Sequence, residues 1–232
     1  SGTAIIAVPN SGFAFNRWSD GRSDNPRTDL NVQNNVSVVA EFVVAPNTSS
    51  WLYFATYGGT PAIERVRVNG TGRQSLVPSA QVGTPVQLAV SRGRDVIVWA
   101  DRGMGRIAKA PLAGGNATTI ANMGDVHGVA IASQANQVFW SQFTAGDVFR
   151  ANLDGSSQAM LFSESSSIAG VAVDESNGFI YYCRYTAGEI ARRNLDGTNP
   201  VVLVGGQTFP SDIQVDPVAG IMVWGSGAGV RT

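Results

Sequence analysis

The chain has 232 residues, enough for one or two domains with a sizeable core, and a formal net charge of −1 at pH 7. Only 14% of the residues are charged, so electrostatics give no argument for a nucleic-acid partner or for an anionic membrane. The single cysteine, Cys183, excludes an internal disulfide, and no apolar run has the length of a membrane span. We therefore expect no nucleic-acid binding, no membrane insertion and a buried, inert thiol.

Residues 1–45 are expected to form a small β-rich module, followed by a short polar linker at residues 46–50. Short apolar runs are separated here by Pro-Asn-Ser-Gly and Asp-Gly turns, which is typical of strands joined by tight connections. Phe13 and Trp18 are interpreted as core residues. The predicted strands are Ala4–Val8, Phe13–Trp18, Asp29–Val32 and Val36–Phe42.

The N-terminal segment also carries a recognisable set of residues. They are Pro9, Gly12-Phe13, Trp18-Ser19-Asp20-Gly21, Asn25-Pro26-Arg27-Thr28 and Val39-Ala40-Glu41-Phe42. With these residues the segment resembles the divergent bacterial surface repeat related to the B repeats of internalins. The resemblance implies a small module of a large secreted or cell-wall protein from a bacterium, with part of the module outside this chain.

Beyond the linker, the sequence repeats itself. Residues Gly128–Ala169 and Gly170–Ser211 align without a gap, which sets a period of about 42 residues. Turns rich in Gly, Asn, Asp and Ser separate four strand-length apolar runs in each period, and no helical run is long enough to cover a parallel sheet. In the second copy these runs are Gly170–Val173, Phe179–Tyr182, Glu189–Leu195 and Val201–Val204. Four antiparallel strands per period predict one blade of a β-propeller, and hence an all-β protein.

The second strand of the repeat can be recognised five times in the sequence. It reads Leu52-Tyr53-Phe54, Val96-Ile97-Val98-Trp99, Val138-Phe139-Trp140, Ile180-Tyr181-Tyr182 and Met222-Val223-Trp224. The first strand is largely apolar on both faces, as expected for an innermost strand between two neighbouring blades. It reads Val86–Val90, Val129–Ile131, Val171–Val173 and Ile213–Val215. About five blades are therefore represented.

Two motifs recur within the repeat. One is Phe139-Trp140-Ser141-Gln142 and Tyr181-Tyr182-Cys183-Arg184, and the other is Asn152-Leu153-Asp154-Gly155 and Asn194-Leu195-Asp196-Gly197. With them, residues 51–232 resemble a YWTD-type β-propeller, the repeat class of the low-density-lipoprotein receptor family, in a style close to bacterial secreted propellers. The first motif stands where that family has Tyr-Trp-Thr-Asp, with most of the Thr-Asp half replaced. The second matches its Leu-Asp-Gly turn.

The two end blades are predicted to be incomplete. The first begins at its second strand near Trp51, and the last stops at a third strand near Gly229-Val230-Arg231. The resemblance implies a ring of six blades, so three arrangements stay open. The chain is a fragment of a longer protein, or it closes as a five-bladed ring, or another chain completes the open edge by strand addition.

Candidate ligand-binding residues lie where loops enter the innermost strands, at one end of the central channel. The aligned positions are Val86-Gln87, His127-Gly128, Ala169-Gly170 and Ser211-Asp212, and Asp125 precedes the only histidine. A histidine beside a carboxylate can act as a base or help to hold a metal, although a single such pair is a weak signal. The candidates are Gln87, Asp125, His127, Ser211 and Asp212.

Other recurring residues have structural explanations. Asp174 and Asp216 share one repeat position and are expected to cap hairpin turns through their own backbone. Phe143 and Tyr185 share a loop position after the second strand, where they either pack between blades or stack on sugars. No G-x-S-x-G elbow, paired histidines or CxxC is present, so no catalytic residue, metal ligand set or cofactor is predicted.

These observations favour a non-enzymatic, secreted or surface-displayed binding or structural protein that presents loops on a rigid propeller. Its partner would be a protein or a glycan, with self-association through open blade edges as a further mode of assembly. Two alternatives stay open. One is a lactonase- or lyase-type propeller enzyme with a central metal, and the other is a subunit of an extracellular filament or virion.

Overall fold

A computed structural model describes residues 4–10, 13–44 and 50–232 of the chain. It divides into two compact units, the first reaching Leu52 and including Val66–Gly72, the second comprising Tyr53–Arg65 and Arg73–Thr232. Most of the predicted linker at residues 46–50 lies outside the described residues, so the domain border stays a prediction.

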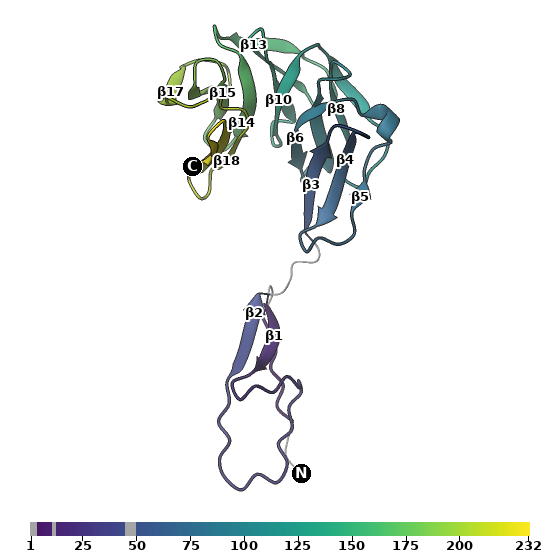
Figure 1. Ribbon diagram of the computed structural model, residues 1–232, viewed down its shortest axis with the longest axis vertical. Helices are drawn as coiled ribbons and strands as arrows, with labels where there is room; N and C mark the ends of the chain where they lie inside the picture. Colours follow the sequence, from purple (N-terminus) through teal and green to yellow (C-terminus); the bar gives the residue numbers. More distant parts are fainter. Residues whose placement is uncertain (1–3, 11–12, 45–49) are drawn as a thin grey trace. The chain divides into compact units, whose positions relative to one another are not determined.

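The N-terminal unit contains a two-stranded antiparallel sheet, β1 (Phe13–Trp18) and β2 (Ala40–Val44) (Figure 1). The prediction for β1 is confirmed, whereas the strand predicted at Val36–Phe42 begins later, at Ala40. The predicted strand Asp29–Val32 does not form, because Asn31 adopts a left-handed conformation with φ of 54°.

The predicted strand Ala4–Val8 is reduced to one bridge, between Ile5 and Arg27. The Asn25 side chain replaces a strand partner there: its carbonyl oxygen accepts from Ala7 N at 3.0 Å, and its amide donates to Ala7 O at 2.8 Å. An amide side chain can thus satisfy backbone groups without a ladder.

Trp18 is a core residue as predicted, but Phe13 is not. Trp18 is 4% exposed, donates its indole N–H to Asp24 O at 2.8 Å and lies under the Arg27 guanidinium. Phe13, the first residue of β1, is 48% exposed.

Five antiparallel sheets follow in chain order and form the five blades of the propeller (Figure 1). Three have four strands, and the first and last have three, as the sequence predicts for the end blades. The only helix in the described part is the 3₁₀ turn η1 (Ser79–Gln81), and no helix there has the length and hydropathy to cross a membrane.

The strands of the blades have the following bounds. Blade 1 contains β3 (Trp51–Thr56), β4 (Ala62–Arg67) and β5 (Gln74–Ser75). Blade 2 contains β6 (Pro85–Ser91), β7 (Val96–Asp101), β8 (Arg106–Pro111) and β9 (Thr118–Asn122). Blade 3 contains β10 (Val126–Ala132), β11 (Gln137–Gln142), β12 (Asp147–Asn152) and β13 (Ala159–Ser163). Blade 4 contains β14 (Ile168–Asp174), β15 (Phe179–Arg184), β16 (Glu189–Asn194) and β17 (Val201–Val204), and blade 5 contains β18 (Ile213–Asp216), β19 (Ile221–Ser226) and β20 (Gly229–Arg231).

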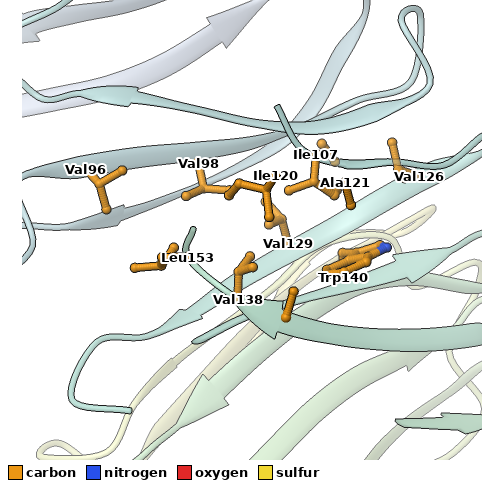
Figure 2. Close-up of a cluster of buried hydrophobic side chains, with 12 residues drawn as sticks. Val96, Val98, Ile107, Ile120, Ala121, Val126, Val129, Val138, Trp140 and Leu153 are labelled. Atoms are coloured by element: carbon orange, nitrogen blue, oxygen red, sulfur yellow. The ribbon is translucent and has the colours of Figure 1, made fainter. Parts of the chain in front are cut away.

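The core consists of layers between consecutive blades, because each strand alternates its side chains between two neighbours. In β7, Val98 packs toward blade 3, whereas Ile97 and Trp99 pack toward blade 1. Figure 2 shows the layer between blades 2 and 3, where Val98 and Ile107 meet Val138 and Trp140. The four buried clusters of the described residues join consecutive blades, and none joins the last blade to the first.

Two glycines allow the innermost strands to approach closely. A Cβ at Gly128 would lie 2.5 Å from Ala169 O, and one at Gly170 would lie 2.8 Å from Asp212 Cα. No real Cβ makes backbone contacts this short, so any larger residue would push β10 from β14, or β14 from β18. Gly128 and Gly170 are therefore needed where blades 3, 4 and 5 converge, whereas the aligned positions in blades 2 and 5 carry Gln87 and Asp212.

The Leu-Asp-Gly turns also connect blades. Asp154 accepts hydrogen bonds from the backbone and hydroxyl of Ser156, at 2.9 and 2.6 Å, which fixes the turn. Gly155, with φ of 90°, lies so close to blade 2 that a Cβ would be 2.7 Å from Ile120 O. Asp196 and Gly197 repeat the arrangement against Leu161 of blade 3.

Candidate functional site at the channel mouth

One repeated backbone hydrogen bond holds the loops at the mouth of the channel. The residue that follows the second strand of a blade donates its N–H to the residue just before, or at the entry of, the first strand. The bonds are Arg102 N to Thr84 O at 3.0 Å, Phe143 N to Asp125 O at 2.9 Å and Tyr185 N to Ser167 O at 2.8 Å. The hydrogen bond therefore fixes the backbone of the residue that follows the second strand, and with it the starting point of that residue's side chain.

Gln87 lies inside the channel and is a structural residue of the blade packing. Its amide donates to Val171 O at 3.3 Å and accepts from Val129 N at 3.1 Å, so it crosses β10 and joins three innermost strands. The side chain is 7% exposed. Both the nitrogen and the oxygen of its amide therefore have backbone partners, and its ligand-binding role stays a prediction.

Asp125 and His127 lie together, with Arg102 of blade 2 beside them. The Asp125 carboxylate accepts from Thr144 N at 2.7 Å and lies 3.4 Å from the Arg102 guanidinium. Burial opposes the charge of Asp125, but the hydrogen bonds from Thr144 and the charge of Arg102 outweigh it and lower its pKa. This carboxylate is therefore ionised and already paired.

His127 is held as a neutral, stacked ring. Burial and the Arg102 charge lower its pKa, and Asp125 only partly opposes them. Its ring stacks on Phe143 with 5.1 Å between centroids, and its buried Nδ1 makes no hydrogen bond. A ring in this position does not share a proton with Asp125 in the way a catalytic base would.

Ser211 and Asp212 lie at the entry to β18, and both are exposed. In the described residues no hydrogen bond or ion pair joins Asp212 to Asp125 or His127; its carboxylate accepts only from Ile213 N, at 2.8 Å. The surrounding protein nevertheless desolvates this carboxylate and raises its pKa.

Cys183 fits the prediction of an inert thiol. It is fully buried in the layer between blades 4 and 5, and no disulfide partner exists in the chain. Burial, followed by the charge of Asp212, raises its pKa to about 12, so the thiol stays protonated.

A row of aromatic rings crosses the channel mouth from blade 3 to blade 5. Phe143 contacts His127 on one side and Tyr185 on the other, each with 5.1 Å between centroids. Tyr185 stacks in turn on Phe209, at 5.0 Å. Sequence reasoning found Phe143 and Tyr185 by their shared repeat position. It missed Phe209, because the two preceding copies carry Ser167 and Asp125 at this repeat position, so no aromatic residue recurs there.

Asp101 is a second residue that sequence reasoning missed. It is fully buried at the end of β7 and accepts from Gly83 N at 3.0 Å, Thr84 N at 2.9 Å and Met104 N at 3.2 Å. It closes the sequence Val98-Trp99-Ala100-Asp101, which keeps the Trp and Asp of the Tyr-Trp-Thr-Asp signature. That likeness was the signal that could have found it.

A polar cluster between blades 3 and 4 was also missed. Glu164 accepts from the Tyr182 hydroxyl at 2.7 Å and from Arg193 at 2.9 Å, and Arg184 lies 3.4 Å away. Arg184 also pairs with Glu189. Burial, and then the Glu164 hydrogen bond, raise the pKa of Tyr182 to about 12. These contacts join the two blades, although the buried Nε of Arg184 has no hydrogen-bond partner among the described residues.

The remaining acidic residues serve the turns. Asp174 accepts from Asn177 N at 3.0 Å and from Ser176, and Asp216 accepts from Val218 N and Ala219 N, both at 3.0 Å. The predicted turn role is confirmed for both. Across the described ranges, no three His, Cys, Asp or Glu side chains gather in the way that a metal site requires.

The comparisons with known proteins agree with this architecture. The family model of the divergent InlB B-repeat domain matches residues 1–46. Among solved structures, a chain of a nidogen/laminin complex is similar, with a TM-score of 0.69 and 22% identity over 76% of this chain and 69% of that chain. The resemblance of residues 51–232 to a YWTD-type propeller is confirmed at the level of fold.

Two bacterial structures are similar as well. A gluconolactonase from Xanthomonas campestris has a TM-score of 0.66 and 17% identity, over 78% of this chain and 67% of that chain. A putative TolB from Agrobacterium tumefaciens has a TM-score of 0.61 and 13% identity, over 74% and 65%. At these identities the likeness shows the fold, which hosts binding proteins and enzymes alike.

Proposed function

We propose that the chain is a non-enzymatic binding protein, secreted or displayed on a cell surface, which holds its ligand at the channel mouth. The observation that carries the proposal is the fixed row of aromatic side chains there. Their backbone is held by the repeated hydrogen bonds of Phe143 and Tyr185, so little entropy is lost when a ligand binds.

The polar groups of the same face support binding over catalysis. Asp125 is paired with Arg102, and His127 is neutral and stacked on Phe143. Gln87 is occupied by backbone partners. Groups that are paired or stacked in this way shape a surface, whereas a general base needs a free path to the proton it removes.

The comparisons support the location. The N-terminal match is to a domain related to the B repeat of InlB, and the nidogen/laminin structure is a complex of a similarly folded protein with a partner. Both favour a surface or extracellular setting in which a propeller contacts another molecule, here a protein or a glycan.

The proposal is tested with the whole 232-residue chain on arrays of immobilised laminin, collagen, fibronectin and oligosaccharides. Gluconolactone hydrolysis is followed in parallel with added Ca²⁺, Mg²⁺ or Zn²⁺. We expect saturable binding to at least one array member and no turnover above the blank. Metal-dependent hydrolysis that Asp212→Asn abolishes would contradict the proposal. The absence of binding to any member of the arrays would contradict it as well.

A second candidate is assembly with another chain through the open face of blade 5. Gln214 is exposed, although its counterparts Ala130 and Ala172 in blades 3 and 4 are 6% and 5% exposed beneath the next blade. Ile221 and Val230 on the same blade are 49% and 76% exposed. Light scattering is expected to show a multimer that Ile221→Lys dissociates; a monomer at all concentrations would exclude this assembly.

A further inference from the structure

The aromatic row consists of His127, Phe143, Tyr185 and Phe209, and it is only partly buried. The first three are half-buried, and Phe209 at its end is 54% exposed. The Phe143 and Tyr185 rings rest on the layer between blades 4 and 5, which supports them from below. Packing between blades therefore accounts for only part of their surface.

Phe209 has an unusual backbone. Its φ is 48°, in the left-handed region that bulky side chains rarely adopt, so the conformation is strained. The neighbouring backbone holds it there through Gly227 N, which donates to Thr208 O at 2.6 Å. In this conformation the Phe209 ring stacks on Tyr185 while the residue stays 54% exposed. Strain of this kind concentrates at sites that bind ligands.

The surroundings of the row carry little net charge. Asp125 pairs with Arg102, and Arg184 pairs with Glu164 and Glu189. Exposed hydroxyl side chains lie beside the rings in sequence, at Thr144, Thr186, Thr208 and Ser211. Apart from Asp212, these charged groups are already paired, whereas a ligand with hydroxyl groups would find both donors and acceptors.

We propose that the aromatic row is a carbohydrate-binding platform that stacks a neutral sugar ring on Phe209 and its neighbours. The inference rests on the proposed function and names its ligand class. One face of a pyranose ring carries C–H bonds, which pack on the electron-rich face of an aromatic ring. The hydroxyl groups at the edge of the sugar would meet the threonine and serine side chains.

Asp212 suits this chemistry. Asp212 is exposed, and its carboxylate has no cationic partner in the described residues. A sugar hydroxyl can donate to such a carboxylate without bringing a charge into the site. No apolar cavity is needed, because sugars bind on shallow aromatic surfaces, unlike the apolar ligands of enclosed pockets.

The test measures binding of the whole chain to an array of neutral gluco-, galacto-, manno- and N-acetylhexosamine oligosaccharides. The strongest of these is then titrated by calorimetry. We expect Phe209→Ala to weaken binding about tenfold, as expected for the loss of one stacked ring. Phe209→Trp, which keeps a ring, should retain binding. Phe13→Ala removes an exposed phenylalanine from the N-terminal unit and should change nothing.

Several results would overturn the inference. They are the absence of binding to every neutral oligosaccharide, binding that Phe209→Ala leaves intact in a folded protein, or binding only to basic peptides with strong dependence on salt. Binding of an extracellular protein to this face without any neutral glycan would remove the inference and leave the proposed function standing. Binding to none of the arrays would remove both.

Discussion

Blades 2 and 4 have the same strand order but different side-chain locks. In blade 2, the buried carboxylate of Asp101 accepts three backbone N–H groups at the channel-mouth end. The same repeat position in blade 4 is Arg184, which contacts Glu164 and Glu189 instead. One lock ties a loop within its own blade, and the other joins blades 3 and 4.

What the two blades share is backbone. Arg102 N donates to Thr84 O in blade 2, and Tyr185 N donates to Ser167 O in blade 4, at 3.0 and 2.8 Å. The repeat therefore constrains main-chain geometry and leaves side chains free to change. That freedom allows one position to carry an arginine in blade 2 and the aromatic rings Phe143 and Tyr185 in blades 3 and 4.

The largest loss of stability is expected where a substitution prevents the close approach of two innermost strands. Gly128→Ala places a Cβ 2.5 Å from Ala169 O and 2.7 Å from Val171 N, so β10 and β14 must separate. We expect the free energy of unfolding to fall by about 3 kcal/mol, the upper part of the range for overpacked sites. Urea unfolding followed by tryptophan fluorescence measures it.

The matched control is Gly93→Ala, in the turn between β6 and β7. A Cβ there meets nothing within 4 Å, so stability should change little. Equal losses in the two variants would show that the close approach of the innermost strands is not what the glycine serves.

The next effect separates the two locks. Asp101→Asn keeps the shape of the side chain but turns one acceptor into a donor that faces backbone N–H groups. We expect a loss of about 2 kcal/mol in the free energy of unfolding, because a buried donor is left unpaired. Gln142→Ala, at the same position in blade 3, removes one exposed bond to Gly124 O and should cost far less. Similar losses would mean that the buried carboxylate has no special part in blade 2.

Sequence patterns predicted the blades well because strand alternation and turn chemistry are local. The strands at Phe179 and Val201 begin where the repeat placed them, and the end blades have three strands as expected. The N-terminal unit was harder to predict, since Asn25 satisfies backbone groups that the pattern assigned to a strand. Apolar alternation cannot show such a replacement.

The candidate site was predicted only in outline. The alignment located the channel mouth. It could not show that the Gln87 amide forms hydrogen bonds with the backbone of Val129 and Val171, because those contacts join three blades. The stacking of Phe209 on Tyr185 depends on an irregular loop with a positive φ. Both contacts depend on side chains that the other copies do not repeat, so the repeat pattern alone could not predict them.

The blade 4 lock should depend on pH. Burial opposes ionisation of Glu164, but hydrogen bonds from Arg193 and Tyr182 and the charge of Arg184 prevail and lower its pKa below the ordinary 4.5. Its contribution is therefore complete above pH 4.5 and is lost as the pH falls through the lowered value. We expect Glu164→Gln to cost about 1 kcal/mol at neutral pH, a modest value because the cluster is partly screened.

Unfolding measured across acidic pH checks this dependence. The stability difference between Glu164→Gln and the unchanged chain should shrink as the pH falls below 4.5. Gln142→Ala is a suitable comparison, since its side chain does not titrate and donates only to Gly124 O, so its effect on stability should not change over this pH range. A difference that stays constant with pH would show that the charge of Glu164 does not join the blades.

The smallest expected effect is a change in the pKa of His127. The residue that follows the second strand is the charged Arg102 in blade 2 and the aromatic Tyr185 in blade 4, so the two should influence this pKa differently. Burial, and then the Arg102 charge, lower the pKa of His127 below 6.5, so protonating it costs stability as the pH falls through that value. His127 is the only histidine, and NMR titration therefore follows one imidazole without assignment. Arg102→Ala should raise this pKa, because a nearby positive charge is removed, whereas Tyr185→Phe should leave it unchanged. A pKa of His127 that does not respond to Arg102→Ala would mean that burial alone sets it, and that the arginine of blade 2 serves only its pair with Asp125.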